Sequence, residues 1–363
     1  MRQISCELLT QSAPPHLQQI FTGFTNLAQA GIVDVSERFV RGPAARDWTL
    51  TVRAHGRTIV YDVHDSHIVD PVLLDAADYY FKRSFQPAYV ATLGSHATRV
   101  HPLGLNYEVL PDHLDFAGAR RNWHLRRGHR RFSGVISALH LSPRFTPRQH
   151  VFENGMRSHQ GGRALFLTRA WDPHDAPERE QHGIDQREAI NEMRARCIAR
   201  LRDDLGDRVL AGFAHSEFAM RCYPDLLVPD PSLCDKRRYL AAVRQADVCV
   251  TTTGVHGSVG WKLGEYVALG KAIVSERIAH RLPGNFRAGT HYLDFSSDEA
   301  CVAAVHALLS DPARRRAMAA ANRAYYQQHL RPDQLVLNTL RTALQNDAEI
   351  SCEDVVALAA PQA

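Results

Sequence analysis

Apolar and polar positions alternate most clearly in the second half of the chain. Ala164-Leu-Phe-Leu-Thr168 is a continuous apolar run of strand length, and residues 184–205 form a charged amphipathic stretch followed by Gly206, a residue typical of helix ends. The same pattern predicts further strands at 208–213, 246–251 and 271–275 and helices at 236–245 and 258–269. Repeated strand–helix units predict a mostly parallel sheet with helices on both faces. After it we expect helices at 298–309, 311–329 and 333–344.

The first 150 residues carry weaker patterns. Residues 48–52 and 58–62 flank the turn His55-Gly56, which predicts a β-hairpin or two adjacent strands. Residues 15–30 space their apolar side chains at helical intervals. We further expect a helix at 71–78, a strand at 79–83, an exposed basic connection at 116–131 and a buried strand at 133–141.

The chain length favours two domains. There are 363 residues, and domains commonly hold roughly 100–200. Glycine-containing turns at 153–155 and 160–162 mark the boundary. We predict an N-terminal domain at 1–155, a second domain at 163–330, a crossing helix at 331–345 and a loose tail at 346–363.

Composition and charge exclude several classes of protein. The chain is 45% hydrophobic, which is typical of globular proteins and not of disordered ones. Its 43 basic and 39 acidic side chains leave a net charge of +4, too small to indicate nucleic acid as a partner. Seven cysteines without a C-x-x-C pair argue against a disulfide framework and a zinc site. With no signal-peptide pattern and no long apolar run, we expect a soluble cytoplasmic protein.

The most informative segment follows the strand expected at 246–251. Gly254, Gly257 and Gly260 allow a ligand to approach the backbone closely, and a helix then begins near Ser258. Free N–H groups and the positive end of the helix dipole would form an anion site at the carboxyl edge of the sheet. The spacing matches neither the dinucleotide fingerprint nor the P-loop. The alternative is a plain turn followed by an exposed ion pair between Lys262 and Glu265.

The segment Lys262-Leu-Gly-Glu-Tyr-Val-Ala-Leu-Gly-Lys-Ala-Ile-Val274 resembles the donor-binding segment of GT-B-fold glycosyltransferases. The later segments 289–295 and 308–318 and Asn322 fit the same resemblance, which covers about residues 164–330. It implies the GT-B fold: two Rossmann-like α/β domains facing a central cleft. The nucleotide-sugar donor would bind the second domain and the acceptor the first.

The resemblance also implies roles for individual residues. Glu265 would hold the ribose, and Arg169, after the first strand of the second domain, would face the donor diphosphate. The remaining donor-binding candidates are Gly254, Gly257, Ser258 and Lys262. Many retaining members carry a second Glu eight positions before the ribose-binding one, and here that position is Gly257. Retaining and inverting transfer therefore both stay open.

Candidates for the acceptor side come from the first domain. An inverting transferase needs a general base, and Asp62, His64 and His67 lie together at the end of an expected strand. The alternative is a polar loop in which Asp65-Ser66 caps the next helix. We expect no metal ion, because Arg, Lys and the helix dipole take that role in this fold. A metal pair of His64 and His67 is the less favoured alternative.

Two groups of basic residues have open interpretations. Lys82 and Arg83 either reach a phosphate or acidic acceptor or form a solvated strand end. The arginines within 120–131, interleaved with Trp123 and His124, either hold the protein near anionic lipid or polysaccharide or form a solvated loop. The cluster Arg314–Arg316 is expected on the surface.

These observations predict a metal-independent, hexosyltransferase-like glycosyltransferase without a cofactor, acting in polysaccharide biosynthesis. It would transfer a sugar from a nucleotide-sugar to a hydroxyl of a glycan or glycolipid acceptor. We expect it in the cytoplasm, with peripheral contact with the inner membrane as a further partner. The alternatives are a non-catalytic nucleotide-binding or scaffold protein on the same fold, or a nucleotide-sugar epimerase.

Overall fold

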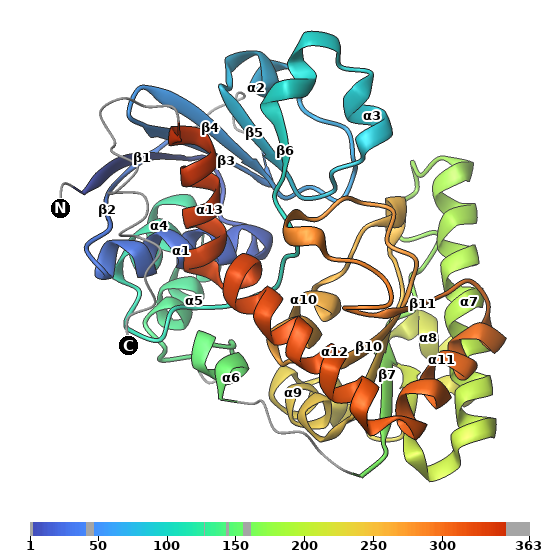
Figure 1. Cartoon of the computed structure of the whole chain (residues 1–363). Helices are drawn as coiled ribbons and strands as arrows, with labels where there is room; N and C mark the ends of the chain where they lie inside the picture. The colour runs from blue at the N-terminus through green and yellow to red at the C-terminus, as the bar shows by residue number, and fades with distance from the viewer. Residues whose placement is uncertain (1–2, 41–46, 127, 143–144, 155–160, 346–363) are drawn as a thin grey trace. The chain divides into compact units, whose positions relative to one another are not determined.

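The computed structural model describes residues 3–40, 47–126, 128–142, 145–154 and 161–345, which fall into two compact units (Figure 1). Unit 1 comprises residues 1–149, 280–284 and 327–363, and unit 2 comprises residues 150–279 and 285–326. Each unit is built on one β-sheet. Unit 2 is therefore interrupted once, by the five residues 280–284 that belong to unit 1, and the chain after residue 326 belongs to unit 1 again.

The sheet of unit 1 is mixed. Its strands, in the order β2-β1-β3-β4-β5-β6, are β1 (Ile4–Thr10), β2 (Val33–Phe39), β3 (Thr49–Ala54), β4 (Arg57–Asp62), β5 (Tyr79–Lys82) and β6 (Val100–Pro102). β3 runs antiparallel to both its neighbours, and the other pairs are parallel. The predicted hairpin is confirmed as β3–β4. His55 (φ 47°) and Gly56 (φ 72°) both adopt the left-handed backbone that two-residue hairpin turns favour.

The helices of unit 1 are α1 (Gln18–Gln29), α2 (Pro71–Ala76), α3 (Pro87–Ala91), α4 (Phe116–Leu125), α5 (His129–Ala138) and α13 (Pro332–Leu344), with 3₁₀ turns at Pro15–Leu17 and Gly94–Arg99. The buried strand predicted at 133–141 is wrong, because most of this segment belongs to α5. The exposed connection predicted at 116–131 is wrong too, because α4 covers most of it. The small residue Gly134 lets α5 lie close to α4, where Asn122 Nδ2 donates to the Gly134 carbonyl at 3.2 Å.

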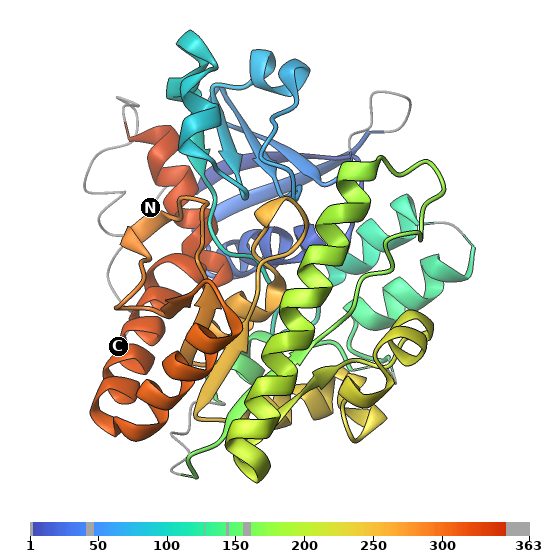
Figure 2. The ribbon, with the colours of Figure 1, turned by 90° about the vertical axis from the view of Figure 1, so that its right-hand side faces the viewer.

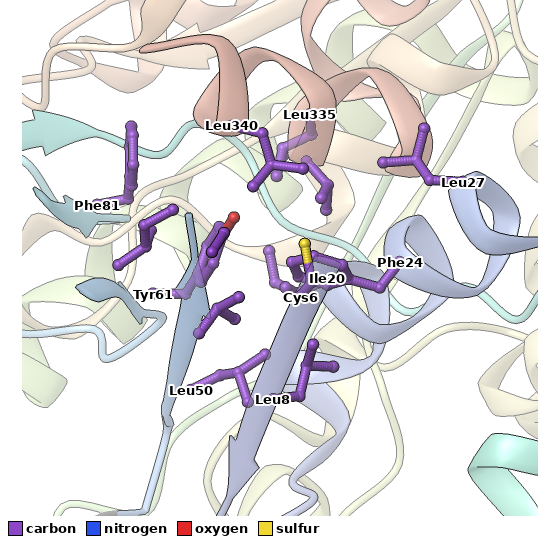
Figure 3. Close-up of a cluster of buried hydrophobic side chains, with 14 of the residues drawn as sticks. Cys6, Leu8, Ile20, Phe24, Leu27, Leu50, Tyr61, Phe81, Leu335 and Leu340 are labelled. Carbon is purple, nitrogen blue, oxygen red and sulfur yellow. The ribbon is translucent and has the colours of Figure 1, made fainter. Parts of the chain in front are cut away.

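The core of unit 1 contains side chains from α1, near the N-terminus, and from α13, near the C-terminus. Figure 3 shows Ile20, Phe24 and Leu27 of α1 beside Leu335 and Leu340 of α13, all packed on the strands. The helices approach closely at Gly23, where a Cβ atom would lie 2.3 Å from the Pro332 carbonyl oxygen. Tyr61 of β4 is fully buried and its hydroxyl lies 2.7 Å from Thr339 Oγ1. The C-terminal helix α13 is therefore an integral part of unit 1.

The sheet of unit 2 was predicted to be mostly parallel, and all its strand pairs are parallel. Its strands, in the order β11-β10-β9-β7-β8, are β7 (Ala164–Thr168), β8 (Val209–Phe213), β9 (Val248–Thr251), β10 (Ala272–Glu276) and β11 (Leu293–Phe295). The chain passes from β7 to β8 on one side and then continues from β9 on the other. In open α/β sheets, ligands bind beyond the carboxyl ends of strands at such a reversal of strand order.

Helices cover both faces of this sheet. They are α7 (Gln181–Leu205), α8 (Glu217–Cys222), α9 (Lys236–Gln245), α10 (Trp261–Ala268), α11 (Asp298–Ser310) and α12 (Pro312–Tyr325), followed by a π-helical turn at Tyr326–Leu330; α6 (Gln149–Glu153) lies where the chain enters unit 2. α7 and α11 share a core with the sheet, and α9 and α10 lie on its other side (Figure 1). Figure 2 shows α7 running along unit 2 in yellow-green. Among the described helices, none has the length and apolar character needed to cross a membrane.

Candidate functional site

The loop between β9 and α10 is closed on itself. It passes through a 3₁₀ turn at Val255–Gly257, and the Gly254 N–H donates to the Ser258 carbonyl at 2.8 Å. Gly257 has a φ of 63°, in the left-handed region that favours glycine. The helix expected from Ser258 begins only at Trp261, with Gly260 as its N-cap. Ser258 is instead buried inside the loop, three residues before the helix begins.

The buried side chain of Arg194 and the half-buried side chain of Glu276 hold the start of this loop. Arg194 of α7 is 5% exposed and donates to Thr252 Oγ1 at 2.8 Å and to the Thr253 carbonyl at 3.1 Å. Glu276, at the end of β10, accepts from the Thr253 N–H at 2.7 Å and from its hydroxyl at 2.9 Å. Burial lowers the pKa of Arg194 to about 10, although Glu276 opposes this shift. The loop is therefore fixed from both sides before it reaches its glycines.

Glu265 of α10 is completely buried. One of its carboxylate oxygens, Oε1, accepts a hydrogen bond from Nζ of Lys236, at the start of α9. The other oxygen, Oε2, has no hydrogen-bond partner within the described part of the chain. The exposed Lys262–Glu265 pair, considered above as an alternative, is therefore wrong: Glu265 is buried and pairs with Lys236.

Lys262 lies against an aromatic ring. Its Nζ is 4.1 Å from the ring centroid of Tyr239, and Lys236 Nζ is 5.2 Å from the same centroid. The pKa of Lys262 is lowered to about 8, mainly by burial; Glu265 opposes this shift, and nearby Lys236, Arg194 and Arg169 add to it. These four basic residues, Arg169, Arg194, Lys236 and Lys262, form what we call the basic cluster. Two carboxylates, Glu265 and Glu276, oppose it, so the cluster carries an excess of positive charge.

Arg169 directly follows β7, at the strand-order reversal of the sheet. Its side chain is exposed, and its guanidinium stacks 3.6 Å above the ring of Trp171. Its backbone carbonyl accepts from Arg194 at 2.8 Å. Unit 2 thus brings together Arg169, Lys262, Glu265 and the glycine loop, as predicted from the resemblance. The sequence analysis missed Arg194, Lys236, Tyr239 and Glu276; for Glu276 the available signal was its place directly after the strand predicted at 271–275.

Asp62 forms the centre of a buried network in unit 1. It is 3% exposed, and its Oδ2 accepts from Lys82 Nζ at 2.8 Å and from the Tyr80 hydroxyl at 2.5 Å. Its Oδ1 accepts from the His64 N–H at 2.9 Å. Burial lowers the pKa of Lys82 against the effect of Asp62, and burial together with Asp62 raises the pKa of Tyr80. Both oxygens of Asp62 are therefore engaged within unit 1.

Lys82 and Arg83 are not the solvated strand end considered above. Lys82 is fully buried and Arg83 is 6% exposed, because β4 and β5 are parallel and their carboxyl ends meet at one sheet edge. Arg83 Nη1 donates to Asp65 Oδ1 at 2.7 Å. The cap expected from Asp65-Ser66 is wrong as well. Asp70 caps α2, accepting from the N–H groups of Val72 and Leu73.

The two candidate histidines differ in their surroundings. His64 is exposed, and its Nδ1 accepts from the Ser66 N–H at 3.2 Å. His67 is half-buried and packs edge-on against Tyr89 at 5.1 Å between ring centroids. A residue that the sequence analysis missed, His280, joins this group when the chain returns to unit 1, where the Arg281 N–H donates to the Phe85 carbonyl at 2.9 Å. Burial lowers the pKa of His280, and His67 and Arg83 lower it further.

We compared the chain with known proteins. Residues 186–341 match the model of the glycosyl transferase-like family. A glycosyltransferase from Rickettsia africae superposes with a TM-score of 0.42 at 10% identity, covering 93% of this chain and 83% of that chain. Anabaena HepE in complex with UDP-glucose gives 0.40 at 12% identity, covering 94% and 99%. A putative UDP-N-acetylglucosamine 2-epimerase from Listeria monocytogenes gives 0.38 at 16% identity, covering 77% and 62%. The curated proteins yield no match.

The family match covers most of unit 2. It begins in α7 and ends in α13, and so includes the glycine loop, Glu265 and three members of the basic cluster. Residues 186–341 are therefore similar to the glycosyl transferase-like family, which agrees with the resemblance to glycosyltransferases described above. The predicted α/β class is confirmed, with two units each built on one sheet. Within the described residues, no three His, Cys, Asp or Glu side chains are grouped as metal ligands would be.

The pKa of Lys262 leads to a prediction for ligand binding. If its ammonium pairs with a diphosphate, nucleotide affinity falls as the pH rises through about 8, because Lys262 then loses its positive charge. An ordinary lysine would stay charged to about pH 10.4. The sign for stability is opposite. The native state binds the Lys262 proton less well than the unfolded chain does. The contribution of Lys262 to stability therefore rises with pH between about 8 and about 10.4. Titration calorimetry from about pH 7 to about pH 10, a range that spans the lowered pKa of Lys262, checks the binding.

Lys262→Met is the matched control. It should bind the nucleotide more weakly at pH 7 and lose this pH dependence, because no proton is left to titrate at the site. A wild-type affinity that is constant across the range would show that Lys262 does not contact the diphosphate.

Proposed function

We propose that this protein transfers a hexose from a nucleotide-sugar to a hydroxyl group of a glycan or glycolipid acceptor, without a metal ion or cofactor. It would act in polysaccharide biosynthesis in the cytoplasm, with peripheral contact with the membrane. One observation carries the proposal: the basic cluster surrounds a glycine loop and a buried carboxylate with one free oxygen. This combination fits a ligand that carries both a diphosphate and a ribose.

The donor would bind at the carboxyl edge of the unit 2 sheet. A Cβ atom added at Gly257 or Gly260 would meet no atom within 4 Å, so the backbone there is open to close approach. Lys262, Arg169 and the N-terminus of α10 would balance the phosphate charge, and Glu265 Oε2 would accept from a ribose hydroxyl. The same cations stabilise the charge that develops on the departing nucleoside diphosphate, the role that a metal ion fills in other enzymes.

The acceptor hydroxyl needs a base, and the contacts in unit 1 rank the three candidates. Both oxygens of Asp62 are occupied, and Nδ1 of His64 already accepts a hydrogen bond. No side-chain hydrogen bond involves the ring of His67 within the described residues. We therefore assign the base to His67. His67→Gln would abolish transfer and leave nucleotide binding unchanged, whereas His64→Gln would affect transfer less.

The test is thermal stabilisation by nucleotides. UDP, GDP, ADP, CMP and dTDP, each with and without an attached sugar, are added to the full chain. Ligand at 100 times its Kd stabilises the native state by about 2.7 kcal/mol, so a selective rise in Tm identifies the base. The matching nucleotide-sugar is then incubated with candidate acceptors and the products are analysed. No rise with any nucleotide would favour the scaffold alternative, and conversion of the donor sugar without an acceptor would indicate an epimerase.

A further inference from the structure

The hairpin of α4 and α5 in unit 1 gathers the exposed apolar side chains of this protein. Nine large apolar side chains are exposed in the described structure, and six of them lie within residues 114–141. Phe116 is 68% exposed, Phe132 60% and Trp123 44%. An apolar patch concentrated in this way, and not scattered, marks an interaction surface.

These side chains form one continuous face. Phe116, Arg120 and Trp123 are spaced four and three residues apart on α4, and Phe132 and Ile136 are four apart on α5. The two helices are joined by the ring contact of Trp123 with Phe132, at 5.5 Å between centroids. We call Phe116, Arg120, Trp123, Arg130, Phe132 and Ile136 the hairpin face; all six are exposed.

The charge of this surface has one sign. Residues 114–141 contain six arginines and a single acidic residue, Asp115. Arg121 is buried and pairs with Glu37, whereas Arg120 and Arg130 are exposed. Asp115 is 1% exposed and caps α4 by accepting from the Gly118 N–H at 2.7 Å, so it contributes no negative charge to the surface. Arginine side chains lie beside the rings, with the Arg131 guanidinium 4.7 Å from the centroid of Trp123. Aromatic rings next to cationic side chains are typical of surfaces at the membrane interface.

We propose that the hairpin face binds the surface of an anionic phospholipid membrane. Its aromatic and aliphatic side chains enter the headgroup region, and its arginines pair with lipid phosphates. Charge complementarity selects this occupant. A second copy of the chain would place the same arginines against one another, and a soluble polyanion would leave Phe132 and Ile136 in water. The inference deepens the peripheral location within the proposed function, and its test needs neither nucleotide nor sugar.

The experiment is sedimentation of the full chain with phosphatidylcholine vesicles that contain or lack phosphatidylglycerol. We expect binding to the anionic vesicles that weakens with added salt. Arg120→Gln together with Arg130→Gln should lower the partition constant about 30-fold, as expected for two basic residues near such a surface. Phe132→Ser together with Ile136→Ser should lower it at least about tenfold, because partial burial of both side chains is lost.

Matched controls carry the same changes elsewhere. Arg314→Gln with Arg316→Gln removes two exposed charges from α12, and Val72→Ser with Met220→Ser removes two exposed apolar side chains from other helices. Both controls should bind like the wild type, and Tm values verify that every variant is folded. The proposal is overturned if the wild type does not sediment with anionic vesicles or if the hairpin variants bind as well as the controls. A dimer that is lost in the Phe132→Ser, Ile136→Ser variant would also overturn it.

Discussion

Replacing Asp62 by alanine is expected to lower the free energy of unfolding by about 3–5 kcal/mol, since it leaves a buried charge without its partner. Lys82 has no exposed side-chain surface, and its Nζ is 2.8 Å from Asp62 Oδ2. The Tyr80 hydroxyl loses its acceptor at the same time. Urea unfolding of the variant and the wild type, compared at pH 7, measures the difference.

Two controls separate the buried pair from a general effect of losing a carboxylate. Asp204→Ala breaks an exposed pair with His306, so it should cost at most about 1 kcal/mol. Asp62→Leu combined with Lys82→Met removes both charges and should recover most of the lost stability. If Asp62→Ala stays within about 1 kcal/mol of the wild type and abolishes transfer, Asp62 is a catalytic base and not a structural residue.

This result bears on how a loss of activity is interpreted. An inactive Asp62 variant does not by itself make Asp62 a catalytic base, because the substitution disturbs the sheet edge that carries His64 and Arg83. His67 is the better choice for that purpose. It is half-buried and packs against Tyr89 without a role in the Asp62–Lys82 network.

The sequence predicted those parts of the fold that local patterns determine. The β3–β4 hairpin follows from its turn residues, and the parallel sheet of unit 2 follows from short apolar strands that alternate with long amphipathic helices. The prediction for 133–141 failed because its small and β-branched residues suit a strand, while packing of α5 against α4 decides the outcome. Local preference is weak where a tertiary contact competes with it.

Contacts between residues that are distant in the sequence could not be predicted from local patterns. One alternative paired Glu265 with Lys262, one helical turn away, but its partner Lys236 comes from the preceding helix. Arg194 looked like one of many charged residues in a long helix, and only the fold turns it toward Thr252. His280 joins unit 1 because the chain returns there for a few residues, which no periodicity reveals.

Glu265→Ala should weaken nucleotide binding by roughly 10- to 150-fold, the equivalent of one hydrogen bond to a charged group, with little effect on the fold. Oε2 is the atom left without a partner among the described residues, so its contact with a ribose hydroxyl would be lost. Lys236, freed of its partner, is 25% exposed and can turn toward water. Calorimetric titration with the nucleotide selected by thermal stabilisation measures the change in Kd.

Lys236→Met is the matched control for Glu265→Ala. It removes the partner of Oε1 and leaves Oε2 in place, so it should weaken nucleotide binding less than Glu265→Ala does. If the carboxylate serves only to pair with Lys236, both variants should lose similar stability and neither should lose ribose recognition. A Glu265→Ala protein that unfolds, or that binds nucleotide as tightly as the wild type, therefore makes Glu265 structural and removes it from the donor site. A deoxyribonucleotide lacking the hydroxyl should bind the wild type more weakly but bind Glu265→Ala no worse than the ribonucleotide does.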